Sequence, residues 1–252
     1  MTATIRAWGT DRVIKHYHDP CPRLPSWERD MTLQARRLGL PAPRVDELIT
    51  VDGRPALVME RLHGLSAAYV LRHHPQRSYE VLEATLDLWE RLWAAEIPPS
   101  GHFPRINTEI ARRISSARVL SSRHKQLLIQ RLEEITQHTV LCHGDLQPSN
   151  ILFTQKGPML LDWLDFSLGD PTADLARCLL TCHLGDPEGH FTRLFTQLRQ
   201  AWYTKSGANP IYLEGWLRIT AAAYLADPES PHHPHLHRIA TGAEDVRALV
   251  EG

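Results

Sequence analysis

One stretch of the chain restricts the fold more than any other: a polar loop held between short apolar runs. Asp145 lies in this loop, Asn150 follows it by five residues, and the apolar run 159–161 leads directly to Asp162. Short apolar runs bounded by turn residues are typical of buried strands, so both loops would be held rigidly. With this spacing, a loop aspartate can face an attacking hydroxyl while the asparagine turns back toward a metal that the second aspartate also binds.

The first 62 residues predict two hairpins and one helix. Ser26 stands where an N-cap residue is expected, and Gly39 ends the helical pattern. Asp52-Gly53 is a turn dipeptide that favours a tight hairpin. The expected elements are strands at 2–8 and 13–17, a helix at 26–38, and strands at 45–51 and 56–60.

The remainder of the chain is mainly helical in pattern. Apolar residues recur near a 3.6-residue period, most clearly over Tyr79 to Ala95. The tryptophans of these segments are expected in the core or in the lining of a pocket, and the His-rich stretch 231–237 is expected to be a loop or a helix start. The predicted helices are 79–95, 108–119, 123–136, 173–183, 191–205, 212–226 and 243–250, with short strands within 140–153 and 159–162.

The composition is that of an ordinary globular protein and excludes several other classes. Hydrophobic residues make up 42% and charged residues 23% of the 252 residues, enough to bury a sizeable core. A formal net charge of -1 offers no field for nucleic acid or an anionic membrane, and no apolar run approaches about 20 residues. Four cysteines without a CxxC spacing fit a reducing compartment. We therefore expect a cytoplasmic protein without nucleic-acid or membrane partners; the oligomeric state stays open.

Three motifs in order identify a family. His-Gly-Asp-x-x-x-x-Asn begins at His143, an apolar run with Asp-Trp ends at Trp163, and Gly-Asp-Pro-x-x-Asp-Leu-Ala begins at Gly169. In this combination the chain resembles the aminoglycoside phosphotransferases and choline kinase-like enzymes over nearly its whole length. The resemblance implies an α+β, bilobal protein-kinase-like fold. Residues 1–62 would form a small, β-rich nucleotide-binding lobe, shorter than usual, and residues 63–252 a larger helical lobe that carries catalysis and binds the substrate.

The same resemblance implies a role for each matching residue. Asp145 would orient and deprotonate the acceptor hydroxyl, and Asn150 and Asp162 would hold Mg²⁺. Lys15 would contact the nucleotide phosphates, with Glu28 as its partner. The adenine of ATP would lie against Met59 and the backbone of Glu60 to Leu62.

The implied reaction is transfer of the γ-phosphoryl group of ATP to a hydroxyl of a small metabolite or antibiotic. The acceptor pocket is expected to involve residues 100–107 and 188–190. A protein Ser/Thr kinase is disfavoured, because Asp162 is followed by tryptophan and no Ala-Pro-Glu-like end of an activation segment is present. A catalytically silent nucleotide-binding scaffold is the other alternative, although no catalytic Asp or Asn is missing.

Other polar residues have plainer expected roles. His143 and Asp174 are expected to hold the catalytic loop, and Asp170 to cap the helix that follows it. Asp165 is a weaker candidate for substrate contact. The thiols of Cys178 and Cys182, with His183, are expected in the core rather than on a metal. The histidines at 232, 233, 235 and 237 are expected on a solvated loop, since no Cys or carboxylate set there completes a tetrahedral site.

The start of the chain departs from the family pattern. In kinase-like enzymes two strands and a glycine-containing turn precede the lysine strand and cover the phosphates, but only 14 residues precede Lys15. Residues 1–8 would then be the second strand, and the first strand would be absent. The expectation is modest ATP affinity with appreciable hydrolysis by water. A true start upstream of Met1 is the rival explanation.

Overall fold

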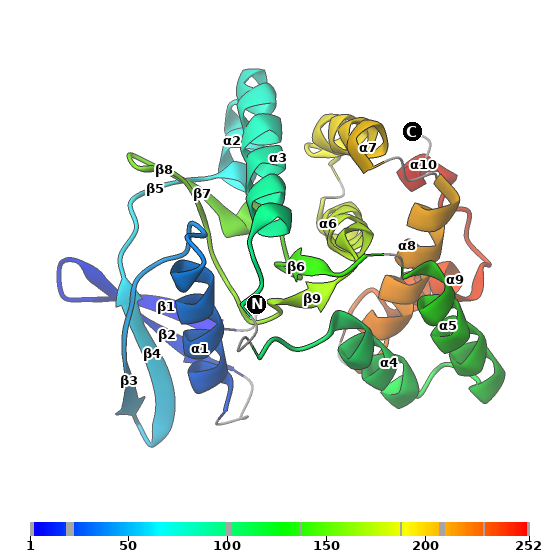
Figure 1. The fold of residues 1–252 in the computed structure, drawn as a ribbon, viewed down its shortest axis with the longest axis horizontal. Helices are drawn as coiled ribbons and strands as arrows, with labels where there is room; N and C mark the ends of the chain where they lie inside the picture. The colour runs from blue at the N-terminus through cyan, green and yellow to red at the C-terminus, as the bar shows by residue number, and fades with distance from the viewer. Residues whose placement is uncertain are drawn as a thin grey trace.

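The N-terminal part of the chain is a four-stranded antiparallel sheet with one helix packed on it (Figure 1). The computed structural model describes residues 3–18, 23–98, 102–136, 138–186, 188–206, 210–228 and 230–250. The strand order is β1-β2-β4-β3, so β2 lies inside the sheet. The elements are β1 (Ala3–Trp8), β2 (Arg12–Tyr17), α1 (Leu24–Arg37), β3 (Val45–Val51) and β4 (Arg54–Glu60).

The pattern of this part follows the predicted one except at the start of α1. The helix begins at Leu24, two residues before the predicted cap Ser26, and Pro25 lies in its first turn. Proline suits this place because a first-turn N–H has no partner within the helix. The Ser26 hydroxyl instead donates to the carbonyl of Arg23 (2.9 Å).

The larger part is helical, with two small sheets at its junction with the first (Figure 1). Strands β5, β7 and β8 form one antiparallel sheet, and β6 pairs with β9. The helices are α2 (Ala67–His73), α3 (Ser78–Ala94), α4 (Ile106–Ser116), α5 (Ser122–Ile135), α6 (Pro171–Gly185), α7 (Thr192–Ser206), α8 (Pro210–Tyr224), α9 (His233–Thr241) and α10 (Arg247–Val250). The strands are β5 (Gly64–Ser66), β6 (Val140–Cys142), β7 (Ile151–Thr154), β8 (Gly157–Leu160) and β9 (Ser167–Gly169).

The core of the helical part contains the tryptophans, as predicted. Trp89, Trp202 and Trp216 are fully buried, and the rings of Trp89 and Trp202 meet edge-on at 5.7 Å. Cys178 and Cys182 are buried free thiols, which confirms their place in the core. None of the helices in the described ranges is long and apolar enough to span a bilayer.

In the C-terminal segment, the His-rich stretch is a helix start, one of its two predicted forms, rather than a solvated loop, and the last predicted helix is shorter than expected. Most of the His-rich stretch lies in α9, and the predicted helix 243–250 is reduced to α10. Leu236, Ile239 and Ala240 are buried, so α9 has an apolar face at helical spacing among its histidines. Gly242, with φ +79°, ends α9 because a left-handed residue breaks the helical path. The short elements α2, β5 and β9 were not predicted from the sequence.

Candidate active site

A buried ion pair joins β2 to α1. Lys15 Nζ lies 2.8 Å from Glu28 Oε1 and 2.7 Å from Oε2, and the Tyr17 hydroxyl donates to Oε2 at 2.6 Å. Both charged side chains are almost inaccessible to solvent. Burial raises the pKa of Glu28, and the adjacent Lys15 ammonium opposes that rise. The pair holds the lysine ammonium in one position, facing out of the sheet toward the helical part.

Asp162 reaches this lysine from the other part of the molecule. Its Oδ1 lies 3.2 Å from Lys15 Nζ. Its backbone has φ +63°, a left-handed conformation that is costly for a residue with a side chain. The next residue, Trp163, is fully buried and its indole donates to the carbonyl of Leu160 (2.9 Å). The buried tryptophan therefore fixes the sharp turn that directs Asp162 toward Lys15.

The loop after β6 brings Asp145 and Asn150 into contact. Asn150 Nδ2 donates to the carbonyl and to Oδ2 of Asp145, both at 2.8 Å, and Gln147 Nε2 donates to the same Oδ2 at 3.0 Å. The N–H of Leu161 donates to the carbonyl of Asn150 (2.8 Å), which sets the Asp162 turn beside this loop. Because Nδ2 of Asn150 donates to Asp145, Oδ1 of Asn150 is the atom that could bind a metal. A carboxylate and an amide oxygen suit Mg²⁺, so these residues fit the ion that the resemblance implies.

Asp174 on α6 holds the backbone of the catalytic loop, as expected. It accepts the N–H groups of His143 (2.9 Å) and Gly144 (2.6 Å). Burial raises its pKa to about 7, although both N–H bonds act in the opposite direction. His143 is completely buried, packs edge-on against Trp163, and accepts the N–H of Asp145 at Nδ1 (3.2 Å). Burial lowers the pKa of His143, so the imidazole is a neutral support for the loop.

A cavity of about 790 Å³ adjoins the catalytic loop on the side of α4, α6 and α8. Arg177, on α6, lines it; its Nε lies 3.5 Å from Asp145 Oδ1 and its Nη2 donates to Asp165 Oδ2 at 2.6 Å. Burial works against the charged form of Asp165, but the Arg177 and Arg113 guanidiniums outweigh it and keep the pKa of Asp165 below its usual value. Asp165 thus lines the cavity, as a candidate substrate contact should.

Of the two segments predicted to shape the acceptor pocket, one contributes to this cavity and the other does not. Residues 104–106 line it, but 188–190 do not. Ser100 and Gly101 lie outside the described residues. Segment 188–190 follows α6 at the end remote from Asp174, where the Glu188 carboxylate pairs with His190 (2.6 Å) instead.

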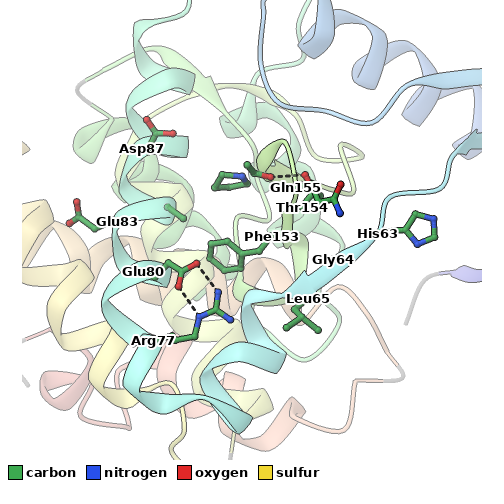
Figure 2. Close-up of a pocket in the computed structure, with 13 residues that line it drawn as sticks. His63, Gly64, Leu65, Arg77, Glu80, Glu83, Asp87, Phe153, Thr154 and Gln155 are labelled. Carbon is green, nitrogen blue, oxygen red and sulfur yellow. Dashed lines mark hydrogen bonds and ion pairs between the residues drawn. The ribbon is translucent and has the colours of Figure 1, made fainter.

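A second hollow, of about 860 Å³, lies away from these residues (Figure 2). It opens between α3 and the β5-β7-β8 sheet, and Figure 2 shows Arg77 paired with Glu80 on its wall (2.8 Å). None of Lys15, Asp145, Asn150 and Asp162 lines it. Its size therefore gives no reason to place chemistry there.

At the position predicted for adenine, the segment after β4 has one backbone N–H without a carbonyl partner in the part of the chain that the structure describes. Met59 is buried in β4. The N–H of Glu60 donates to Arg44 (2.9 Å) and that of Arg61 to Asp11 (2.8 Å). The N–H of Leu62 donates to no carbonyl among the described residues.

Sequence reasoning missed Arg177 and Trp27. Arg177 directly follows the Asp-Leu-Ala motif and is surrounded in sequence by Ala176, Cys178 and other apolar residues. An arginine on an apolar helix face needs an acidic partner, so the sequence around Arg177 could have indicated a buried ion pair. Trp27 gave no signal, because its partner is the distant carbonyl of Leu164, which its indole N–H meets at 2.9 Å.

Comparison with known proteins agrees with this geometry. A family model described as the phosphotransferase enzyme family matches residues 3–230. The chain belongs to this family. The predicted resemblance is confirmed, and the chain is a phosphotransferase. No curated protein matches the sequence.

Solved structures confirm the kinase-like fold of this phosphotransferase. A thermostable mutant of aminoglycoside phosphotransferase APH(4)-Ia, in a ternary complex with AMP-PNP and hygromycin B, has a TM-score of 0.64 at 12% identity, over 99% of this chain and 93% of the other. Aminoglycoside phosphotransferase APH(3'')-Id from Streptomyces rimosus, with ADP and streptomycin, has a TM-score of 0.60 at 18% identity, over 88% and 94%. A choline/ethanolamine kinase family protein from Mesorhizobium loti has a TM-score of 0.60 at 13% identity, over 100% and 90%.

Proposed function

We propose that this phosphotransferase transfers the γ-phosphoryl group of ATP to a hydroxyl of a small molecule, with Mg²⁺ as the metal. One observation carries the proposal: an unbroken series of contacts joins the phosphate lysine to the cavity. Lys15 contacts Asp162 (3.2 Å), the turn before Asp162 bonds to Asn150, Asn150 bonds to Asp145 (2.8 Å), and Asp145 faces Arg177 of the cavity wall (3.5 Å). A nucleotide and an acceptor bound on either side of Asp145 would meet there.

In this proposal each residue has a distinct task. Lys15 binds the nucleotide phosphates, and Glu28 keeps its ammonium in place. Asp162 and Asn150 would hold Mg²⁺, which neutralises phosphate charge when bound. Asp145 orients the acceptor hydroxyl and takes its proton as the oxygen attacks the γ-phosphorus. The bond between that phosphorus and the β–γ bridging oxygen breaks, and ADP leaves.

The cavity argues for a small acceptor rather than a polypeptide. It is formed by side chains from several elements around Asp165 and Arg177, and its volume of about 790 Å³ is that of a site for a compact organic molecule. A protein kinase must instead admit an extended segment across an open surface. The silent-scaffold alternative is disfavoured because Lys15, Asp145, Asn150 and Asp162 are all present and in one connected cluster.

Replacement of the proposed base tests the function. We expect Asp145→Asn to lower turnover at least about 100-fold, the usual contribution of a general base, while MgATP affinity stays nearly unchanged. Turnover is measured as ATP consumption with a panel of alcohols, and affinity by calorimetry. Asp87→Asn, an exposed aspartate on α3 outside the site, is the matched control. Turnover in Asp145→Asn above about a tenth of the normal value would reject Asp145 as the base.

A further inference from the structure

Most of the charged side chains that line the acceptor cavity form ion pairs with one another. Its wall contains four arginines and three acids: Arg105, Arg112, Arg113, Arg177, Glu109, Asp165 and Asp227. Glu109 is held by Arg112 (2.6 and 2.8 Å) and by Arg113 (2.8 Å). Asp165 is held by Arg177 at 2.6 Å and lies 3.7 Å from Arg113. Glu109 and Asp165 are therefore already neutralised within the protein.

Arg112, Arg113 and Arg177 each form an ion pair with a carboxylate of the cavity wall, whereas Arg105 differs from them. It is exposed at the start of α4 and makes no ion pair with any residue of the described ranges. Arg105 directly precedes Ile106, the first residue of α4, and lines the same cavity as Arg112. A guanidinium binds carboxylate and phosphate oxygens through two parallel N–H groups. The wall thus offers an unused anion-binding group.

From these charges we infer that the acceptor carries an anionic group, a carboxylate or a phosphate, in addition to its hydroxyl, and that Arg105 binds that group. The inference rests on the proposed function, because it names the second substrate of the same site. A polycationic acceptor is disfavoured, since its ammonium groups would meet guanidiniums and find Glu109 and Asp165 already paired. Arg105 is a specificity residue in this scheme and takes no part in the chemistry.

Four six-carbon compounds of the glucose series that differ in charge test the inference: glucose, the open-chain acid gluconate, glucose 6-phosphate and glucosamine, with streptomycin as a polycation. Binding to the full chain is measured by calorimetry in the presence of MgADP. We expect gluconate and glucose 6-phosphate to bind at least about 10-fold more tightly than glucosamine and streptomycin, the effect of one charge-assisted contact. The stronger of the two shows whether carboxylate or phosphate is preferred.

Two variants assign the effect to one residue. Arg105→Gln should remove about 10-fold of the anion affinity, whereas Arg118→Gln, an exposed arginine just beyond α4 that does not line the cavity, should leave it unchanged. Equal affinity across the panel, including no binding by any sugar, would overturn the inference, and so would equal loss in both variants. Anion binding without phosphorylation of any alcohol would instead count against the proposed function.

A second observation stands apart from this site. His183, at the end of α6, His235 of α9 and Glu244 after α9 each offer a ligand atom, and these atoms all lie within 4.8 Å of one another. His235 Nε2 is 2.7 Å from Glu244 Oε1, and the two imidazole rings are 5.4 Å apart. Glu244 supplies the carboxylate that the sequence around the histidines did not indicate.

We propose that His183, His235 and Glu244 bind Zn²⁺ or a similar transition metal and tie the C-terminal segment to α6. Ligand atoms around one zinc ion lie roughly 3 to 4 Å apart, since each bond is about 2.0–2.2 Å, so only small side-chain movements are needed. Two imidazoles favour zinc over Mg²⁺. The Arg238 guanidinium, 3.1 Å from Glu244 Oε2, leaves Oε1 for the metal.

Titration of the metal-free chain with ZnCl₂ tests this site, with binding followed by calorimetry and by the unfolding temperature. We expect one equivalent of Zn²⁺ to raise the unfolding temperature, and MgCl₂ to have no such effect. His235→Gln and Glu244→Gln should each weaken binding at least about 10-fold, whereas His237→Gln, a histidine of the same helix outside the cluster, should not. Equal binding by all variants, or none by the wild type, would reject the site.

Discussion

At the scale of single residues, the site depends on buried charges that the fold keeps in place. Asp174 is the clearest case, because its carboxylate is fully buried and holds the catalytic loop through the N–H groups of His143 and Gly144. Its pKa, raised by burial to about 7, lies well above the value near 3.8 of an exposed aspartate. The folded chain therefore holds this proton to a higher pH than the unfolded chain does.

This difference has a defined sign for stability. Between about pH 4 and pH 7 the unfolded state ionises Asp174 first, so the free energy of unfolding falls as pH rises and levels off above the folded-state pKa. From pH 5 to pH 8 the contribution of Asp174 should fall by about 2 to 3 kcal/mol. Urea unfolding of the wild type and of Asp174→Asn, which cannot titrate there, measures it. Parallel pH profiles for the two proteins would contradict the prediction.

At the scale of elements, the loop after β6 requires a glycine where it passes the Asp162–Asp165 segment. Gly144 has φ +79°, and a Cβ there would lie 2.4 Å from the carbonyl oxygen and 2.7 Å from the Cβ of Asp165. The two backbones that carry the catalytic loop and Asp165 therefore approach to a distance that excludes any side chain. This contact sets Asp145 against Arg177.

Gly144→Ala should therefore damage both stability and catalysis. We expect a loss of about 2 to 4 kcal/mol in the free energy of unfolding, from the left-handed conformation and the steric overlap together, and a large loss of turnover. Gly53→Ala is the control, because Gly53 has φ +75° but nothing within 4 Å of the added carbon. The free energy of unfolding of Gly53→Ala should fall by only about 1 to 2 kcal/mol, and this variant should keep full turnover. Equal losses in both variants would show that the contact with Asp165 is unimportant.

At the scale of the whole molecule, the contacts that join the sheet-containing part to the helical part near the site include an ion pair and an indole hydrogen bond. Lys15 meets Asp162 at 3.2 Å, and the Trp27 indole donates to the carbonyl of Leu164 at 2.9 Å. Both contacts end in the segment that follows β8 (Figure 1). The position of one part on the other thus determines where a nucleotide phosphate would lie relative to Asp145.

Removal of the Asp162 carboxylate should make the affinity for ATP independent of Mg²⁺. In the wild type we expect Mg²⁺ to strengthen ATP binding, and in Asp162→Ala we expect the same ATP affinity with and without Mg²⁺, because one carboxylate ligand is lost. Calorimetry with and without Mg²⁺ measures this. The Lys15–Glu28 pair remains, so the fold should persist; Asp46→Ala, in the β3 strand, serves as the control. Unchanged dependence on Mg²⁺ in Asp162→Ala would reject the assignment.

Local sequence alone predicted the loop that contains Asp145 and most of the helices and strands. Asp145, Asn150 and Asp162 lie within 18 residues, and their spacing together with the apolar runs predicts both the chemistry and the two loops. Lys15 and Glu28 were found only through the resemblance, and their contact at 2.7 Å agrees with it. The boundary at residue 62 and the site roles stay predictions. Short elements such as β5 and α2 were missed, because few residues carry too little periodicity.

Only the tertiary structure decided the walls of the cavity beside Asp145 and the His183–His235–Glu244 cluster. Arg113 reaches Asp165 across 52 residues of chain, and His183 meets His235 across a similar separation. Such contacts depend on how α4, α6, α8 and α9 pack, which no local pattern encodes. The sequence therefore determined the reaction class through a compact motif, whereas the packing of distant helices determined which charged side chains line the cavity beside Asp145.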